Sequence, residues 1–267
     1  MMKAFFSFLL FAALRLMPIE SDEKTIRVGM DLTSPPFETI DTKGKPVGIG
    51  VEIAEKFCEY MNEQCSIVNI PFIGLIPSLQ SDKIDMILSS MTPTYERSKV
   101  IAFSNPYLSI GLCLLLSKDS KAIDASSLNS SRYTIVVKTA TTGEAYAKSL
   151  FPKAKIIILD QEASCISEIL QGKADAFLYD QITVYTTWQK YPDKTKVDLT
   201  PLKKDYWCVG MKKESTALMA DFNKFLKDFA EKGGFTELKK KYLQKEEMAF
   251  EKLKTPLIFA PTASESP

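Results

Sequence analysis

Residues 85–99 read DMILSSMTPTYERSK, a short apolar strand followed by a polar loop that contains one arginine. The loop places small hydroxyl residues at the end of the strand, and Arg97 follows Thr92 by five residues. Hydroxyls and free backbone groups can meet an ammonium, and a guanidinium takes a carboxylate through two parallel bonds. The stretch therefore predicts a site for a small zwitterion. A solvated arginine in an ordinary polar loop is the alternative that this stretch leaves open.

Short apolar runs alternate with helical patterns on both sides of this stretch, which is typical of an α/β protein with mostly parallel sheets. Strands are predicted at residues 25–30, 65–70, 85–89, 111–117, 133–138, 155–159, 175–179 and 207–211. Helices are predicted at residues 50–61, 75–81, 142–151, 162–171, 181–190, 215–232 and 235–249. The alternation occurs twice, so we predict two α/β lobes.

The domain organisation follows from where the chain passes between these lobes, near residues 109–113 and again near 204–209. We assign residues 22–110 and 208–250 to lobe 1, and residues 111–207 to lobe 2. Residues 251–267 carry several prolines and small polar residues, so we expect a loose C-terminal tail.

The N-terminus has the pattern of a secretory signal, with Lys3 before an almost wholly apolar stretch at residues 4–14. The stretch is shorter than the roughly 20 residues of a membrane-spanning helix. We therefore expect a signal peptide at residues 1–21, although no clear cleavage site marks its end. No cysteine precedes Cys58, so the cysteine of a bacterial lipid anchor is missing. These features predict a periplasmic protein.

Composition excludes several classes of function. The 267 residues include 34 basic and 33 acidic side chains, and no basic stripe stands out, so nucleic acid is not an expected partner. The absence of histidine excludes histidine-based acid–base and nucleophilic catalysis and most transition-metal sites. No phosphate-binding or dinucleotide-binding glycine motif occurs. We expect neither a cofactor nor a metal.

Five cysteines form an odd set, so an exported protein would keep at least one free thiol. Cys58 lies on the apolar side of a predicted helix that Asn62 can end, and Cys65 begins the next strand. A bridge between them is compatible with that geometry. Cys113 and Cys208 lie in apolar runs, where we expect buried free thiols.

Polar residues follow four predicted strands at their carboxyl ends, where open α/β sheets bind ligands. They are Asp31, Ser89 to Thr92, Thr141 to Gly143, and Asp180. Any one of them could be a cap or a turn residue. Their joint placement predicts that they meet in one cleft.

Taken in order, the motifs resemble those of bacterial periplasmic solute-binding proteins for polar amino acids, the receptor subunits of ABC importers. The resemblance runs from Thr25 to Tyr242. It includes VGMD (28–31), PPFE (35–38), GLIPSLQ (74–80), KID (83–85), residues 89–97, FSNPY (103–107), TTGEAY (141–146) and GKADA (172–176). It implies the two-lobed periplasmic-binding-protein-like fold of type II, with two α/β lobes joined by two hinge strands, and no enzymatic activity.

The resemblance also implies how the α-groups of an amino acid are held. Arg97 would clamp the α-carboxylate, helped by the backbone amides of Thr92 and Thr142, because a helix N-terminus favours an anion. Asp180 would take the α-ammonium, together with the carbonyl of Ser89 and the hydroxyl of Thr92.

The ligand side chain would lie against a second set of residues. The resemblance implies that Phe72 stacks on it, and that Asp31, Ser90 and Lys138 set its identity. Ser34 stands where family members usually have an aromatic residue, so half of an aromatic sandwich is missing. Asp31 with Lys138 suits an amide such as glutamine, whereas Asp31 alone suits arginine, lysine or ornithine.

Two further positions bear on the resemblance. Cys58 and Cys65 match a disulfide of the basic-amino-acid branch of the family, so the resemblance implies that they pair. Gly50 stands where many members have an aspartate, which leaves the orientation of that wall open.

The implied function is a monomeric receptor that closes on a polar L-amino acid and delivers it to the permease subunits of an ABC importer. A receptor that senses its ligand without import is one alternative. A dehydratase-type enzyme on the same fold is another, but it would have no reason to keep an ammonium site at Asp180 for a substrate without an amine.

Overall fold

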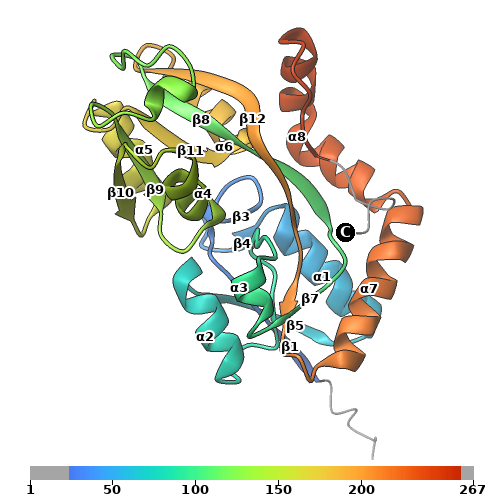
Figure 1. The fold of residues 1–267 in the computed structure, drawn as a ribbon. Helices are drawn as coiled ribbons and strands as arrows, with labels where there is room; N and C mark the ends of the chain where they lie inside the picture. Colours follow the sequence, from blue (N-terminus) through green and yellow to red (C-terminus); the bar gives the residue numbers. More distant parts are fainter. Residues whose placement is uncertain (1–23, 260–267) are drawn as a thin grey trace, which may run out of the picture.

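The computed structural model describes residues 24–259, and Figure 1 shows a two-lobed α/β protein. The sheet of the first lobe has the strand order β5-β1-β6-β13-β7. Its central strand β1 is parallel to β5 and β6, and β13 is antiparallel to β6 and β7. Its strands are β1 (Thr25–Met30), β5 (Gln64–Asn69), β6 (Met86–Ile87), β7 (Ala102–Phe103) and β13 (Gly210–Met211).

The sheet of the second lobe has the strand order β10-β9-β11-β8-β12. Strand β9 is parallel to β10 and β11, whereas β8 is antiparallel to both β11 and β12. The strands β8 and β12 are long and run toward the first lobe in Figure 1. Its strands are β8 (Leu108–Ser117), β9 (Thr134–Lys138), β10 (Lys155–Leu159), β11 (Ala176–Asp180) and β12 (Thr195–Trp207).

A small third sheet was not predicted from the sequence. It consists of β2 (Thr33–Ser34), β3 (Glu38–Ile40) and β4 (Pro46–Val47), in the order β2-β3-β4. Strands of two or three residues are too short to show a two-residue periodicity. The β2-β3 pairing sets Ser34 directly opposite Glu38, so this sheet forms part of the wall of the cleft between the lobes.

Helices cover the sheets, and the predicted helices were found within a few residues of their predicted bounds. Helix α1 ends at Asn62 in the left-handed conformation, as the sequence predicted, and Phe57 of α1 packs edge-on against Phe222 of α7. The helices are α1 (Ile49–Met61), α2 (Leu75–Gln80), α3 (Tyr95–Ser98), α4 (Thr142–Leu150), α5 (Glu162–Leu170), α6 (Gln181–Lys190), α7 (Thr216–Glu231) and α8 (Gly234–Lys252). The 3₁₀ turns are η1 (Phe72–Gly74) and η2 (Ser126–Leu128).

Two expectations about the C-terminal half differ from the structure. The predicted strand at residues 207–211 contains the end of the long β12 and the whole of the short β13. Most of β12 was missed because buried and exposed residues alternate irregularly over residues 195–206. A register shift also interrupts the pairing of β12 with β8 between Asp198 and Lys203. The predicted loose tail is packed at its start, because α8 continues to Lys252 and Phe259 is buried. The lobe bounds that we predicted remain a proposal.

The predicted disulfide is wrong for this structure, since all five cysteines are free thiols. Cys58 lies in the last turn of α1 and Cys65 at the start of β5, and the two thiols are close enough to hydrogen-bond. Hydrogen bonding to Cys65, together with burial, raises the pKa of Cys58. The predicted bond is therefore absent, although the two thiols are hydrogen-bonding neighbours. Cys113 and Cys208 are buried free thiols, as expected.

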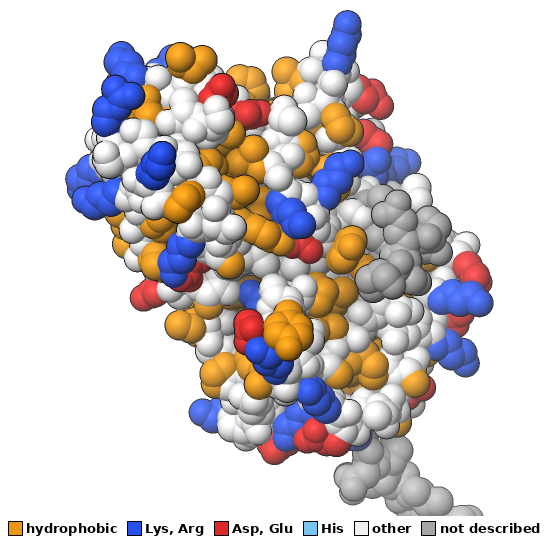
Figure 2. All heavy atoms as spheres, in the orientation of Figure 1, with side chains coloured by type: hydrophobic (Ala, Val, Ile, Leu, Met, Phe, Trp, Pro, Cys, Tyr) orange, Lys and Arg blue, Asp and Glu red, His pale blue; other side chains and the backbone are white. Residues whose placement is uncertain are grey.

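No helix within residues 24–259 has the length and apolar character needed to cross a bilayer. The predicted signal peptide at residues 1–21 lies outside the described residues. On the face shown in Figure 2, lysine and arginine side chains are interspersed with acidic ones, as the balanced composition predicts.

Candidate functional site

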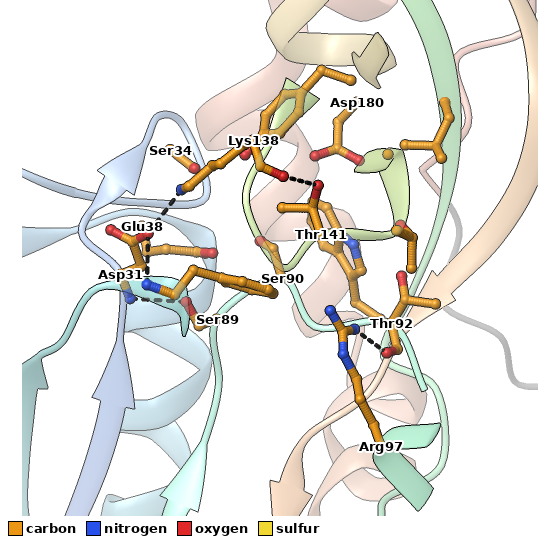
Figure 3. A pocket seen from close by; sticks show the side chains of 16 residues that line it. Asp31, Ser34, Glu38, Ser89, Ser90, Thr92, Arg97, Lys138, Thr141 and Asp180 are labelled. Carbon is orange, nitrogen blue, oxygen red and sulfur yellow. Dashed lines mark hydrogen bonds and ion pairs between the residues drawn. The ribbon is translucent and has the colours of Figure 1, made fainter. Parts of the chain in front are cut away.

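A cavity between the two lobes brings together all ten residues that the sequence singled out as ligand-binding (Figure 3). The cavity is narrow, with a volume of about 30 Å³. The ten predicted residues are Asp31, Ser34, Phe72, Ser89, Ser90, Thr92, Arg97, Lys138, Thr142 and Asp180. Thr141 and Gly143, whose place after a predicted strand also assigned them to the cleft, line the cavity too. The structure adds Glu38, Leu112, Tyr179 and Trp207 to the lining.

Arg97 reaches the cavity from the short helix α3, whose N-cap Thr94 accepts a hydrogen bond from the Arg97 backbone amide. Its guanidinium donates to the carbonyl of Thr92 and, over 2.8 Å, to the carbonyl of Ala140 in the other lobe. Burial lowers the pKa of Arg97 to about 10, so the group stays charged at neutral pH. Within residues 24–259 it forms no ion pair with a carboxylate, which leaves its charge available for an anion.

The N-terminus of α4 faces the same cavity through Thr141, Thr142 and Gly143. The Thr141 hydroxyl donates to the Lys138 carbonyl over 2.7 Å, so it does not cap the helix amides. A Cβ on Gly143 would lie 2.8 Å from the Leu178 carbonyl oxygen, so only glycine lets the helix start pack this closely on β11. Amides at a helix start and the helix dipole favour an anion, as Arg97 does.

Asp180 ends β11 and is the N-cap residue of α6. Burial, followed by the nearby Glu162, raises the pKa of Asp180 to about 7, and the Lys138 ammonium opposes this rise only in part. Its carboxylate has no ion-pair partner in the described part of the chain. A cation bound beside Asp180 would remove the cost of ionising this buried group. Asp180 is therefore suited to hold an ammonium.

Asp31 and Lys138 form a buried ion pair that joins the two lobes. The Lys138 Nζ lies 2.8 Å from the Asp31 Oδ2, and the two side chains are only 2% and 6% exposed. The Asp31 carboxylate also accepts hydrogen bonds from the Thr33 hydroxyl and the Phe72 backbone amide, at 2.9 and 3.1 Å. Asp31 therefore acts both as a loop cap and as the partner of Lys138, and Lys138 does not point to solvent.

The hydroxyl residues after β6 have distinct surroundings. The Ser89 hydroxyl accepts a hydrogen bond from the Asp31 backbone amide over 2.8 Å, which fixes the loop after β1 to the loop after β6. Ser90 has a positive φ of 49°, and its hydroxyl has no hydrogen-bond partner among residues 24–259. The Thr92 carbonyl is taken by Arg97. The Ser90 hydroxyl lies beside the Glu38 carboxylate and the Tyr107 hydroxyl.

Sequence reasoning missed two buried carboxylates at this site. The Ser34 hydroxyl donates to the Glu162 Oε2 over 3.0 Å, and burial raises the pKa of Glu162 to about 7. Glu162 follows β10 at its carboxyl end, so the rule that selected Asp31 and Asp180 would also have selected it. Glu38, in the PPFE motif, lines the cavity itself. Ser34 therefore does not leave an open wall, because it is hydrogen-bonded to the other lobe.

No group of three or more His, Cys, Asp or Glu residues in the described chain is arranged to hold a metal ion. The charged groups around the cavity are instead placed as separate anion and cation sites.

Comparisons with known proteins agree with this geometry. Residues 26–245 match the family model described as bacterial extracellular solute-binding proteins, family 3. The chain is 29% identical over 228 residues to the lysine/arginine/ornithine-binding periplasmic protein of Escherichia coli (strain K12), covering 82% of this chain and 87% of that protein.

Two solved structures have the same fold. A P235GK mutant of ArgBP from T. maritima is 32% identical, with a TM-score of 0.77 over 82% of this chain and 95% of that chain. The ancestral amino acid-binding protein AncCDT-1, a precursor of cyclohexadienyl dehydratase, is 30% identical, with a TM-score of 0.75 and the same coverage. The chain belongs to family 3 of the bacterial extracellular solute-binding proteins.

Proposed function

We propose that this protein is the extracytoplasmic receptor of an ABC importer and that its two lobes close on a polar L-amino acid. One observation carries the proposal: Arg97 and Asp180, two half-buried groups of opposite charge, line one cavity and neither has an ion-pair partner within residues 24–259. An α-carboxylate and an α-ammonium would neutralise both at once. The periplasmic relative named above supports the location and the ligand class.

The charge balance around the cavity supports a basic side chain. Arg97 and Asp180 would be paired by the ligand's own α-groups, and Asp31 and Lys138 already pair with each other. Glu38 then remains as the one lining carboxyl group without a charged partner in the described chain, and a cationic side chain would favour its ionised form. The relatives named for lysine, arginine and ornithine and the ArgBP structure support the same class. An arginine-like or lysine-like ligand is therefore our first expectation, with a glutamine-like amide as the second.

Delivery to a permease and the monomeric state come from the family resemblance. An uptake measurement distinguishes a transport receptor from a sensing receptor. A strain that lacks this protein should lose uptake of the ligand if the protein serves transport. A dehydratase activity has less support, because AncCDT-1 is itself described as an amino acid-binding protein and the curated relative is a binding protein.

The test begins with a thermal-shift screen of the twenty amino acids and ornithine. A ligand at 100 times its Kd stabilises the protein by about 2.7 kcal/mol. Calorimetry then compares the wild type with Arg97→Met, which should weaken every amino acid by about 2–5 kcal/mol, because one partner of a buried charge pair is lost. The exposed Arg132→Met is the matched control and should leave binding unchanged.

Asp180→Asn tests the ammonium site with a second comparison. It should weaken an α-amino acid far more than the deaminated analogue of the same ligand, since the analogue has no ammonium to lose. Equal losses for both would assign Asp180 to folding instead. If Arg97→Met binds every ligand as the wild type does, the site itself is wrong.

A further inference from the structure

The C-terminal part of the chain connects the two lobes a third time, in addition to β8 and β12. Helix α8 begins beside the first lobe, where Phe235 packs edge-on against Phe229 of α7, and Figure 1 shows it running from α7 toward the second lobe. Its first half is tied to α1 through Glu52, whose carboxylate accepts hydrogen bonds from the Lys241 ammonium and the Tyr242 hydroxyl. Because α1 packs on β5, this end of α8 belongs to the first lobe.

The second half of α8 packs on the other lobe. Phe250 is 1% exposed, and its ring centre lies 4.9 Å from that of Tyr185 in α6. Both rings belong to an apolar cluster that side chains of β8, β9, β11 and α5 complete. The helix is continuous from Gly234 to Lys252, so it cannot lengthen between its two ends without losing backbone hydrogen bonds.

Residues 253–259 return from the end of α8 to the strands that join the lobes. The Gln181 Nε2 donates to the carbonyls of Leu199 and Pro256, both over 3.1 Å, and the Gln181 Oε1 accepts from the Ile258 backbone amide over 3.0 Å. The Leu199 carbonyl can accept this bond because the register shift in β12 takes it out of the pairing with β8. One buried side chain therefore ties β12 and the C-terminal segment to the start of α6.

Two further contacts show that the segment is built into the region between the lobes. A Cβ on Gly111 of β8 would lie 3.0 Å from the Ile258 Cδ1, so the glycine lets the segment lie directly on this strand. Phe259 is 6% exposed, in an apolar cluster with residues of both large sheets. Gln181 also follows Asp180, which lines the cavity. The segment is thus one residue away from the candidate ammonium site.

These contacts occur together with contacts across the cleft. Ser34 is hydrogen-bonded to Glu162, Asp31 is paired with Lys138, and the cavity between them is narrow. A hinge rotation that separates these pairs must move α1 relative to α6. Since α8 is attached to both helices and cannot lengthen, opening would break its contacts at one end.

We propose that residues 241–259 form a strap that holds the two lobes in the closed arrangement. The strap touches no residue of a bound ligand, so it acts through the fraction of closed protein. The apparent Kd of a ligand that requires the closed form equals the intrinsic Kd divided by that fraction. Loosening the strap should therefore weaken every ligand by the same factor. This effect on affinity rests on the proposed function, whereas the effect on the shape of the ligand-free protein does not.

Two variants loosen the strap at separate points. Phe250→Ala removes the ring that packs on Tyr185, and Gln181→Met removes three hydrogen bonds. Agreement between them matters because Gln181 adjoins Asp180, whereas Phe250 is not among the residues that line the cavity. Ile169→Ala is the matched control, since Ile169 is also 1% exposed in the same apolar cluster but lies on α5, outside the strap.

Calorimetry with arginine and glutamine measures the effect on affinity. Both ligands should bind about tenfold more weakly to each strap variant, which corresponds to the net loss of about one hydrogen bond from the closed form. The ratio of the two affinities should stay as it is in the wild type. Ile169→Ala should keep the wild-type affinities.

Small-angle X-ray scattering of the ligand-free proteins needs no knowledge of the ligand. Each strap variant should have a larger radius of gyration than the wild type and Ile169→Ala. Saturating ligand should return the strap variants to the radius of the bound wild type, which loss of packing inside one lobe would not explain.

Equal ligand-free radii for the wild type and the strap variants would overturn the inference. It also fails if the affinity ratio changes in Phe250→Ala, or if Ile169→Ala opens the protein as much as Phe250→Ala does. If one strap variant does not fold, the other decides. If no amino acid binds, the proposed function fails, and the ligand-free radii still decide whether the strap holds the lobes closed.

Discussion

Removing the ammonium of Lys138 should separate amide ligands from basic ones. In Lys138→Met the Asp31 carboxylate loses a partner at 2.8 Å in a site where both side chains are almost fully buried. Losing one partner of a buried ion pair costs about 3–5 kcal/mol. The Asp31 carboxylate still accepts hydrogen bonds from the Thr33 hydroxyl and the Phe72 amide. Because these bonds offset part of the loss, we expect the substitution to destabilise the closed form by about 2–3 kcal/mol.

The cost falls on the closed arrangement, because the pair joins the loop after β1 to the end of β9 in the other lobe. Glutamine, which cannot replace the ammonium, should therefore bind about 30–150-fold more weakly to Lys138→Met. Arginine should lose much less, because its guanidinium can take the freed Asp31 carboxylate. The sequence predicted that Asp31 together with Lys138 suits an amide ligand, and the ion pair gives the reason, since Lys138 occupies the carboxylate that a basic side chain would need.

Calorimetry at pH 8 with both ligands on four proteins measures the effect. The proteins are the wild type, Lys138→Met, Asp31→Asn and the double variant, which together form a double-mutant cycle. The double variant removes both charges. The amide at position 31 keeps one oxygen to accept from the Phe72 backbone amide, and its nitrogen can donate to the Thr33 hydroxyl, so the double variant should regain most of the lost glutamine affinity. If the double variant binds glutamine as weakly as Lys138→Met does, the two residues do not act as a pair.

Two further predictions concern stability. The pKa values of Glu38, Glu162 and Asp180 are raised to between about 7 and 8, above their ordinary values near 4, so the folded state binds more protons than the unfolded state in this range. The free energy of unfolding should therefore fall as pH rises from 5 to 8 and then level off; urea midpoints measure it, and a rise over that interval would contradict the assignment. Gly48 has a φ of 132°, and a Cβ there would lie 2.3 Å from a carbonyl oxygen, so Gly48→Ala should destabilise by well over 1 kcal/mol. Gly44→Ala is the control, because Gly44 has a φ of 80° but no neighbour within 4 Å. It should lower the free energy of unfolding by about 1 kcal/mol. Equal urea midpoints for the two variants would refute the role of the contact between position 48 and the carbonyl oxygen.

Local sequence signals were sufficient for the fold class and for most of the site. Alternating strand and helix patterns predicted two α/β lobes, and polar residues at strand ends predicted the cleft. Asp31, Thr142 and Asp180 lie in one cavity because the carboxyl ends of parallel strands meet at one edge of each sheet. Arg97 was found by its spacing from the strand end.

The partners within the site could not be read from the sequence. Lys138 meets Asp31 across 107 residues, and Ser34 meets Glu162 across 128, so no local periodicity records either contact. The short strands that set Ser34 opposite Glu38 were missed for the same reason: their order depends on pairing between segments and not on a repeating pattern. The Cys58–Cys65 disulfide predicted from spacing and resemblance is absent, and the structure has two free thiols in its place.

The sequence by itself determined which chemical groups surround the ligand and at which strand ends they stand, because a strand's end is a local property of the chain. Only the tertiary structure decided which of those groups are already neutralised and which carry a proton. Asp31 and Glu38 are both carboxylates in the wall of one cavity, yet one is paired with Lys138 and the other has an oxygen without a partner within residues 24–259. Their charges differ because burial and neighbours, which the fold supplies, set the free energy of ionisation.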